Sequence, residues 1–350
     1  DKGWVFIPST EFKRDDYEEP LLLNKLREAI NRINSKVDLD EEEVSKAITE
    51  LKLKSSGSDG VRQVLHALKY GVTIKSKRGR DLKPVRLFDF QNLDNNEYLV
   101  SRQVIYRGKE EIKTDVMLYV NGIPLVNIEL KNPAIFSETW LDAYNQIKRY
   151  EREVPELYKY VQIGVAAEAK ARYFPIVPWL DDVRTYEWKD DSADPVDSIL
   201  NMLSRDKILD IIRNYVFIRE EAGLETKVIT RYMQYKASEK IVNRVLGHLD
   251  GKEEKNHGLI WHWQGSGKTL TMIFAANKLY QLKELENPSI FFIVDRRDLR
   301  DQLYQEFTAL DALQPELINS IDDLEAIIKH DEFKGKKGVF ITLIQKFRPE

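Results

Sequence analysis

The chain has 350 residues, of which 42% are hydrophobic and 32% are charged, and this composition excludes a disordered protein. The length exceeds what one core of typical size uses, so it predicts two domains. With 54 lysines and arginines against 58 acidic residues the net charge is -4, which excludes a global positive field for nucleic acid and leaves local patches to bind it.

Residue types and runs that are absent narrow the class further. The sequence has no cysteine, which excludes disulfides and thiolate zinc sites and favours, without proving it, a reducing compartment such as the cytoplasm. No apolar run reaches the about 18 residues of a membrane span, and residues 1–7 do not resemble a signal peptide. There is no initiator Met, and the end follows a strand-like run, so we expect a chain cut at both ends.

The first half of the sequence predicts helices followed by strands. Helices with one apolar face are expected over residues 18–34, 41–52 and 61–70. An antiparallel meander is expected from strands over 86–90, 97–106, 114–120 and 123–130. A helix capped by Ser137 is expected to run to about Glu151, with a strand after it over 161–166.

The second half changes to alternating strands and helices. Residues 175–195 carry three prolines and predict irregular structure, and two helices follow over 197–213 and 231–249. Further strands are expected over 258–262, 289–294 and 338–342, and helices over 268–283, 298–307 and 322–329. This alternation is typical of a parallel sheet covered by helices.

The most specific motif is a glycine-rich loop between a predicted strand and a predicted helix, Gln264-Gly265-Ser266-Gly267-Lys268-Thr269. Its glycines let backbone N–H groups approach phosphate oxygens, Lys268 reaches the terminal phosphates of ATP, and the Thr269 hydroxyl holds Mg²⁺. His262 stands where the GxxxxGK pattern has its first glycine, so only the second half matches. A helix-capping loop is the alternative, but the preceding strand favours nucleotide binding. For His262 we favour packing at the nucleotide pocket over catalysis.

A second motif lies on two predicted strands joined by Asn121-Gly122. Asp115 precedes this turn and Glu129-Leu130-Lys131 follows it, which is the arrangement of PD-(D/E)xK nucleases. In such a site the two carboxylates hold Mg²⁺ against the scissile phosphate, and Lys131 orients water or stabilises developing charge. The alternative is that these are ordinary charges at exposed strand ends.

The nuclease interpretation makes a geometric prediction. A regular two-residue turn would place Asp115 opposite Ile128 and send Glu129 to the other face of the hairpin. We therefore predict a three-residue connection or a β-bulge that pairs Asp115 with Glu129, with their Cβ atoms roughly 5 Å apart. Alternate residues from Val126 to Leu130 are expected to face the core, with Glu129 and Lys131 on the opposite face.

Gln146 and Tyr150 follow on the next predicted helix at positions i and i+4, so both can point at one spot near the hairpin. An ordinary amphipathic helix surface is the alternative. In their order and spacing, the hairpin residues, this pair and the glycine-rich loop resemble the restriction subunit of type I restriction-modification enzymes, from Gly3 to Phe347. In that family a QxxxY element accompanies the nuclease core, and the resemblance implies this role for Gln146 and Tyr150.

Three further segments carry the same resemblance. Residues 231–235 resemble the element whose glutamine contacts adenine, and the amide of Gln234 matches the donor and acceptor edge of that base. Residues 292–302 and 341–347 resemble helicase motifs that line the path of DNA. The residues thereby implied in DNA contact are Arg296, Arg297, Thr342, Gln345 and Lys346. A solvated helix start and a plain strand end are the alternatives.

The resemblance implies an α/β protein with a PD-(D/E)xK nuclease domain over residues 1–222. An incomplete RecA-like helicase lobe, ending before its acidic DEAD-like motif, is implied over residues 223–350. We expect this fragment to bind ATP without hydrolysing it, because the acidic motif and the second motor lobe are absent. An upstream helix that often adds an acidic residue to the nuclease site would precede Asp1.

The intact protein is expected to translocate duplex DNA with ATP and to cut it with Mg²⁺. The implied partners are double-stranded DNA, a methyltransferase subunit and a target-recognition (specificity) subunit, since nothing in these residues suggests sequence readout. The alternatives are another helicase-nuclease fusion, such as a type III restriction or repair enzyme, and an ATP-binding DNA scaffold with structural carboxylates.

Overall fold

The computed structural model describes residues 2–14, 16–76, 81–135 and 137–347. The chain divides into two compact units, Asp1–Val216 and Phe217–Glu350. Within the described ranges, no helix combines the length and the apolar character that crossing a membrane requires.

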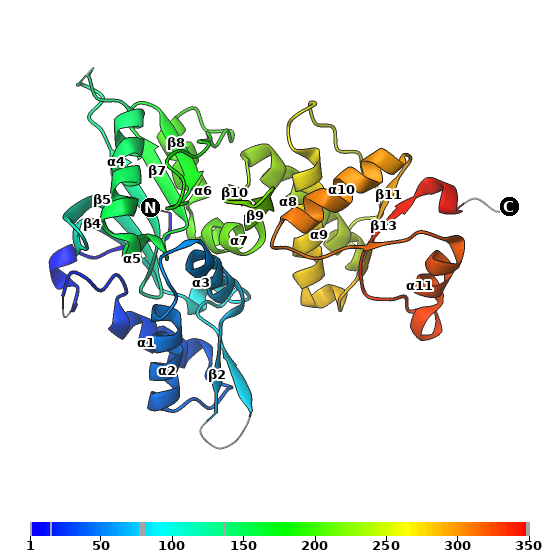
Figure 1. Ribbon diagram of the computed structural model, residues 1–350, viewed down its shortest axis with the longest axis horizontal. Coiled ribbons are helices and arrows are strands. Elements are labelled where there is room, and N and C mark those ends of the chain that lie inside the picture. The colour runs from blue at the N-terminus through cyan, green and yellow to red at the C-terminus, as the bar shows by residue number, and fades with distance from the viewer. Residues whose placement is uncertain (1, 15, 77–80, 136, 348–350) are drawn as a thin grey trace. The chain divides into compact units, whose positions relative to one another are not determined.

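A six-stranded mixed sheet forms the centre of the first unit, in the order β1-β4-β5-β6-β7-β8 (Figure 1). Its strands are β1 (Val5–Phe6), β4 (Tyr98–Arg107), β5 (Glu111–Val120), β6 (Ile123–Leu130), β7 (Ile163–Ala167) and β8 (Ala171–Pro175). The predicted meander is confirmed for β4, β5 and β6, which pair antiparallel. Strand β7 pairs parallel to β6, because a helical crossover connects them.

That crossover is α4 (Trp140–Glu153), which packs against β5, β6 and β7 and is followed by the short α5 (Pro155–Tyr158) (Figure 1). Its apolar stripe, Tyr144, Ile147 and Tyr150, packs into a hydrophobic core of the unit. The expected Ser137 cap is wrong. Thr139 caps the helix instead, because its hydroxyl accepts from the N–H of Leu141 and the Asp142 carboxylate reaches back to the N–H of Thr139.

Three helices precede strands β4 to β8 in the chain, as predicted: α1 (Leu23–Ile33), α2 (Glu41–Lys52) and α3 (Ser58–Tyr70). Two more, α6 (Pro195–Met202) and α7 (Arg205–Tyr215), replace the single helix expected over 197–213. The pattern did not reveal β8 or the hairpin of β2 (Val72–Lys75) and β3 (Leu82–Val85). The expected strand over 86–90 is wrong. The Asp89 carboxylate accepts from the backbone N–H groups of Gln91 and Asn92, which makes a turn.

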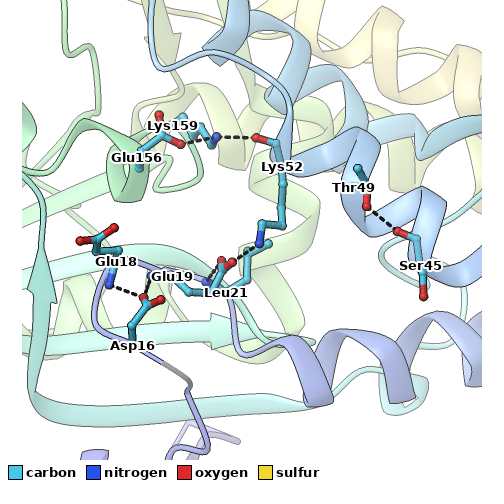
Figure 2. A network of polar contacts seen from close by, with 9 residues as sticks. All are labelled: Asp16, Glu18, Glu19, Leu21, Ser45, Thr49, Lys52, Glu156 and Lys159. Carbon is cyan, nitrogen blue, oxygen red and sulfur yellow. Dashed lines mark hydrogen bonds and ion pairs between the residues drawn. The ribbon is translucent and has the colours of Figure 1, made fainter.

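A buried lysine directly after α5 ties the C-terminal end of α2 to the crossover between β6 and β7 (Figure 2). The Lys159 ammonium, with 2% of its side chain exposed, donates to the backbone carbonyls of Lys52 and Lys54, each at 2.8 Å, and to the Glu156 carboxylate. The last carbonyls of a helix have no hydrogen-bond donor within the helix. The Lys159 ammonium supplies a donor at and just after the C-terminal end of α2. The Lys52 ammonium in turn pairs with Glu19 (Figure 2).

The second unit holds a parallel sheet in the order β11-β13-β12, formed by β11 (Ser289–Val294), β12 (Glu316–Leu317) and β13 (Gly338–Leu343). The predicted strands over 289–294 and 338–342 are thereby confirmed. Its helices are α8 (Tyr232–Leu249), α9 (Lys268–Gln281), α10 (Arg297–Ala309) and α11 (Ile321–Phe333). The hairpin of β9 (Val216–Glu221) and β10 (Leu224–Ile229) was not predicted. Short 3-10 turns are η1 (Ser9–Glu11), η2 (Leu93–Asn95), η3 (Lys283–Leu285) and η4 (Ile344–Phe347).

The strand expected over 258–262 is wrong. These residues have no regular secondary structure, and Leu259, Trp261 and Trp263 are 93%, 81% and 79% exposed. An apolar run becomes a strand only where a neighbouring strand satisfies its backbone groups. Among the described residues, the sheet of the second unit provides no such neighbour for this run.

Replacing Lys159 with Met tests the buried tie. K159M keeps the aliphatic stem but leaves the carbonyls of Lys52 and Lys54 without this charged donor, so we expect urea unfolding to show a loss of roughly 1–3 kcal/mol. The matched control is K46M on α2, whose ammonium pairs with Glu42 at the surface and should contribute less than about 0.5 kcal/mol. Equal losses in both variants would contradict a structural role of Lys159.

Candidate active site

The hairpin of β5 and β6 contains the predicted irregularity. Asn121 and Gly122 form a two-residue turn with φ values of 51° and 80°. From this turn the register runs through Tyr119 opposite Pro124, then shifts, so that Leu118 lies opposite Val126. Leu125 is therefore the extra residue of a β-bulge, and the predicted bulge is confirmed.

The bulge brings the two carboxylates together. Because Val116 pairs with Ile128, the next position in the register sets Asp115 opposite Glu129. The backbone N–H of Asp115 donates to Glu129 Oε1 at 3.2 Å, and the N–H of Leu130 donates to Asp115 Oδ2 at 2.9 Å. Each acid is thus fixed by the backbone of the strand that carries the other.

Helix α4 completes the cluster by setting a glutamine between the acid and the lysine. Gln146 Nε2 donates to Glu129 Oε2 at 2.8 Å, and its Oε1 accepts from the Lys131 ammonium at 2.8 Å. The same amide nitrogen lies 2.8 Å from the Tyr150 hydroxyl, which donates to the carbonyl of Lys113. All five predicted nuclease residues therefore lie within one hydrogen-bonded cluster.

The expected facing of β6 needs one correction. Val126 and Ile128 are buried, but Leu130 is 47% exposed and does not join the core. Glu129 is fully buried. Helix α4 covers the face of β6 that carries Glu129, so the residues of this strand are buried up to Glu129.

Burial governs the charge of the site. Burial raises the pKa of the Glu129 carboxyl to about 8. The hydrogen bond from the Asn127 amide lowers this pKa, whereas the charge of the nearby Asp115 carboxylate raises it. The pKa of Tyr150 is also raised, by burial and by Glu129. A buried acid beside a second acid is an environment that a cation relieves.

The donors present fit Mg²⁺, which prefers oxygen ligands. Asp115 and Glu129 are the residues that would hold it. Among the described residues there is no group of three or more His, Cys, Asp or Glu side chains placed to hold a metal. Water, backbone or phosphate oxygens would therefore have to supply the other ligands of the usual six.

Two residues that the sequence did not reveal form a chain of hydrogen bonds to Glu129 on the side of the core. Asn127 Nδ2 donates to Glu129 Oε1 at 2.9 Å, and the Tyr158 hydroxyl donates to Asn127 Oδ1 at 2.6 Å, with both side chains fully buried. Asn127 lies two positions before Glu129 on the same face of β6, and this spacing is a signal that could have found it. For Tyr158 the sequence offers no such signal.

The glycine-rich loop, residues 264–269 and called the phosphate loop below, has the backbone conformation that nucleotide binding needs. Gly265 and Gly267 adopt φ values of 75° and 83°, and the loop opens α9 at Lys268 as predicted. A Cβ at Gly267 would lie 2.3 Å from Gln234 Nε2 and would displace it, and the positive φ would strain any residue other than glycine. In the same loop Gln264 and Lys268 are exposed, and Thr269 is half-buried.

Gln234 packs against this loop rather than standing free. Its Nε2 donates to the carbonyl of Gly267 at 3.2 Å, and its Oε1 accepts from the N–H of Arg231 at 2.9 Å. The Arg231 guanidinium donates to the carbonyl of Ser266 at 2.7 Å. Contact with adenine would require that Gln234 exchange these bonds. His262 is buried next to the loop, with 8% of its surface exposed, in line with packing.

The residues implied in DNA contact divide into two groups. Arg296 and Arg297 are exposed at the start of α10, and Gln345 is exposed while its Nε2 donates to the carbonyl of Asp295 at 2.8 Å. Since β11 and β13 are parallel neighbours, these residues and the half-buried Lys346 follow the carboxyl edge of one sheet. Thr342 differs from the expectation. It is fully buried within β13, so in this arrangement its hydroxyl cannot reach a DNA strand.

Comparison with known proteins agrees with this arrangement. The family described as type I restriction enzyme R protein N terminus matches residues 1–182, and the family described as SWI2/SNF2 ATPase matches residues 233–350. The class is therefore that of restriction subunits in which an ATPase region follows the N-terminal region. The chain belongs to the type I restriction enzyme R protein family.

Curated relatives are named accordingly. The chain is 33% identical to the putative type I restriction enzyme MjaVIIIP endonuclease subunit of Methanocaldococcus jannaschii, over 99% of this chain and 35% of the relative. It is 32% identical to the type I restriction enzyme HindI endonuclease subunit of Haemophilus influenzae, with the same shares. The type I restriction enzyme SauCOLORF180P endonuclease subunit of Staphylococcus aureus is 28% identical over 63% of this chain and 23% of its own length. The chain spans about a third of the length of its first two relatives.

Replacing Glu129 with Gln tests the buried acid through its pH dependence. The pKa of Glu129 is raised from 4.5 to about 8, so in this interval the folded protein holds a proton that the unfolded chain has released, and stability falls as pH rises. Without metal, E129Q should gain stability relative to wild type as the pH rises through this interval, by up to about 5 kcal/mol at its upper end, and the gain should level off above it. Urea unfolding in a chelator measures it, and a difference that does not change with pH would contradict the raised pKa.

Proposed function

We propose that the chain comprises the nuclease part and the ATP-binding beginning of a type I restriction subunit. The intact subunit translocates duplex DNA with ATP and cleaves it at a Mg²⁺-dependent PD-(D/E)xK site. The nuclease belongs to the first unit, and the first RecA-like lobe belongs to the second. The β-bulge at Leu125 carries the proposal, because it sets Asp115 opposite Glu129.

The residues of the cluster divide the work of phosphodiester hydrolysis. Asp115 and Glu129 bind the divalent cation, which when bound polarises the phosphate and lowers the pKa of water. Lys131 donates hydrogen bonds that orient the attacking water or stabilise charge on the phosphate oxygens. Gln146 bonds Glu129 and Lys131 together and so sets their spacing, while Tyr150 anchors Gln146.

Nucleotide binding is assigned to the loop of the second unit. Backbone N–H groups of residues 264–267 hold phosphate oxygens of ATP, and Lys268 neutralises the terminal phosphates. Thr269 binds the Mg²⁺ that accompanies ATP, and Gln234 contacts adenine after releasing the loop carbonyls.

The proposed partners follow from the relatives' names and from the chemistry of the chain. Arg296, Arg297, Gln345 and Lys346 contact the backbone of duplex DNA, which carries no sequence information by itself. The target sequence is therefore read by a separate specificity subunit, which acts with a methyltransferase subunit.

Replacing Asp115 with Asn tests the nuclease assignment. D115N keeps the shape of the side chain but removes the charge that holds the cation, so cleavage by the assembled full-length enzyme should fall at least roughly 100-fold while ATP hydrolysis persists. The control E111Q removes an exposed carboxylate of the same strand, paired with Arg107, and should cut normally. Undiminished cleavage by D115N would reject the nuclease site and favour a scaffold with structural carboxylates.

Replacing Lys268 with Ala tests the nucleotide site. The ammonium is a point charge for phosphate, so K268A should weaken ATP binding by at least about tenfold, as measured by titration of a fluorescent ATP analogue. The control K255A removes an exposed lysine from the segment before the loop and should bind as wild type does. Equal affinities for K268A and wild type would contradict the assignment.

A further inference from the structure

One residue beside the carboxylates has a strained backbone. Gln103 lies within β4 with φ 54°, a region that residues other than glycine rarely adopt and almost never inside a strand. On either side of it Arg102 pairs with Val116 and Val104 pairs with Thr114. The register is the same before and after it, so Gln103 lies opposite Asp115, and neither strand carries an extra residue there.

The hairpin of β4 and β5 bends at this point. In a straight strand Ile112 and Met117 would face opposite sides of the sheet, yet both enter the same hydrophobic core. The Tyr106 hydroxyl also meets that of Tyr119, although Tyr106 pairs with Ile112, which in a straight strand lies about 23 Å from Tyr119. The bend gives one reason for the positive φ of Gln103. It does not explain the direction of the Gln103 side chain.

The Gln103 side chain is directed at the Asp115 carboxylate. Its Nε2 donates to Asp115 Oδ1 at 3.1 Å, while the N–H of Leu130 donates to Asp115 Oδ2 at 2.9 Å. Each oxygen therefore accepts one hydrogen bond and keeps lone pairs for a cation. The Gln103 carbonyl in turn accepts from the Ser9 hydroxyl at 3.4 Å. Gln103, Asp115 and Leu130 line one open pocket of about 480 Å³, through which solvent reaches this side of Asp115.

We propose that Gln103 is a positioning residue of the nuclease site, whose amide holds the Asp115 carboxylate in the orientation that binds the divalent cation. The inference rests on the proposed nuclease function and deepens it. Groups that hydrogen-bond a metal ligand typically change metal affinity by about 10- to 100-fold when removed.

Two substitutions separate the amide from the backbone. Q103A removes the amide but keeps a Cβ in the strained conformation, whereas Q103G removes both. If the amide positions Asp115, both variants in the assembled full-length enzyme should need about tenfold more Mg²⁺ for half-maximal DNA cleavage, with an unchanged KM for DNA. Q103G should melt a few degrees above Q103A, because glycine adopts a positive φ without strain.

Binding is also measured without catalysis, as the shift in thermal midpoint that Mg²⁺ produces in the DNA-free protein. This shift should be smaller in both Gln103 variants than in wild type at the same Mg²⁺ concentration. The control is D38G, which relieves a positive φ of 50° at an exposed position of the same unit. It should melt higher than wild type and keep the wild-type dependence on Mg²⁺.

The outcomes are distinct. A wild-type dependence on Mg²⁺ in Q103A overturns the inference and leaves Gln103 as a bend in the strand. Impairment of Q103G alone also overturns it, since the backbone and not the amide would then matter. If D115N still cleaves DNA, the proposed function itself fails, whereas an inactive D115N beside an unaffected Q103A rejects only the role of Gln103.

Discussion

The site depends on which face of the sheet each side chain of β6 points to. Side chains alternate between the two faces of a sheet, so Asp115 and Glu129 share a face only if the hairpin between them contains an extra residue. Leu125 is that residue. The contacts of Glu129 with Gln146, and through it with Lys131, follow from this one insertion, because α4 covers the face to which the bulge turns Glu129.

A second constraint is the cost of burying negative charge. Glu129 has no exposed surface and lies beside another carboxylate, so its surroundings by themselves favour its protonated form. Asn127 and Tyr158 offset part of this cost with hydrogen bonds from the core side, and Gln146 adds one from α4. The fold therefore holds two carboxyl groups so close together that both are favoured in the ionised form only when a cation lies between them.

The sequence was sufficient where local rules decide the structure. If Asp115 and Glu129 are to meet, residue parity requires a three-residue connection or a bulge in the hairpin, although it does not single out Leu125 as the extra residue. Long-range contacts lay beyond such rules: the chain from Tyr158 through Asn127 to Glu129 joins distant segments. The apolar run over 258–262 predicted a strand because hydropathy does not reveal whether a pairing partner exists. The burial of Thr342 was missed for a related reason, since a motif does not say which face of a strand is covered.

The exposed segment before the phosphate loop has an experimental use. Trp261 and Trp263 are solvated, and their ring centroids lie 5.6 Å apart, immediately ahead of the glycines at 265 and 267. Indole emission depends on solvation and on neighbouring rings, so these two of the six tryptophans form an intrinsic optical probe of the loop. Rearrangement of the loop is thus observable by fluorescence without an added label.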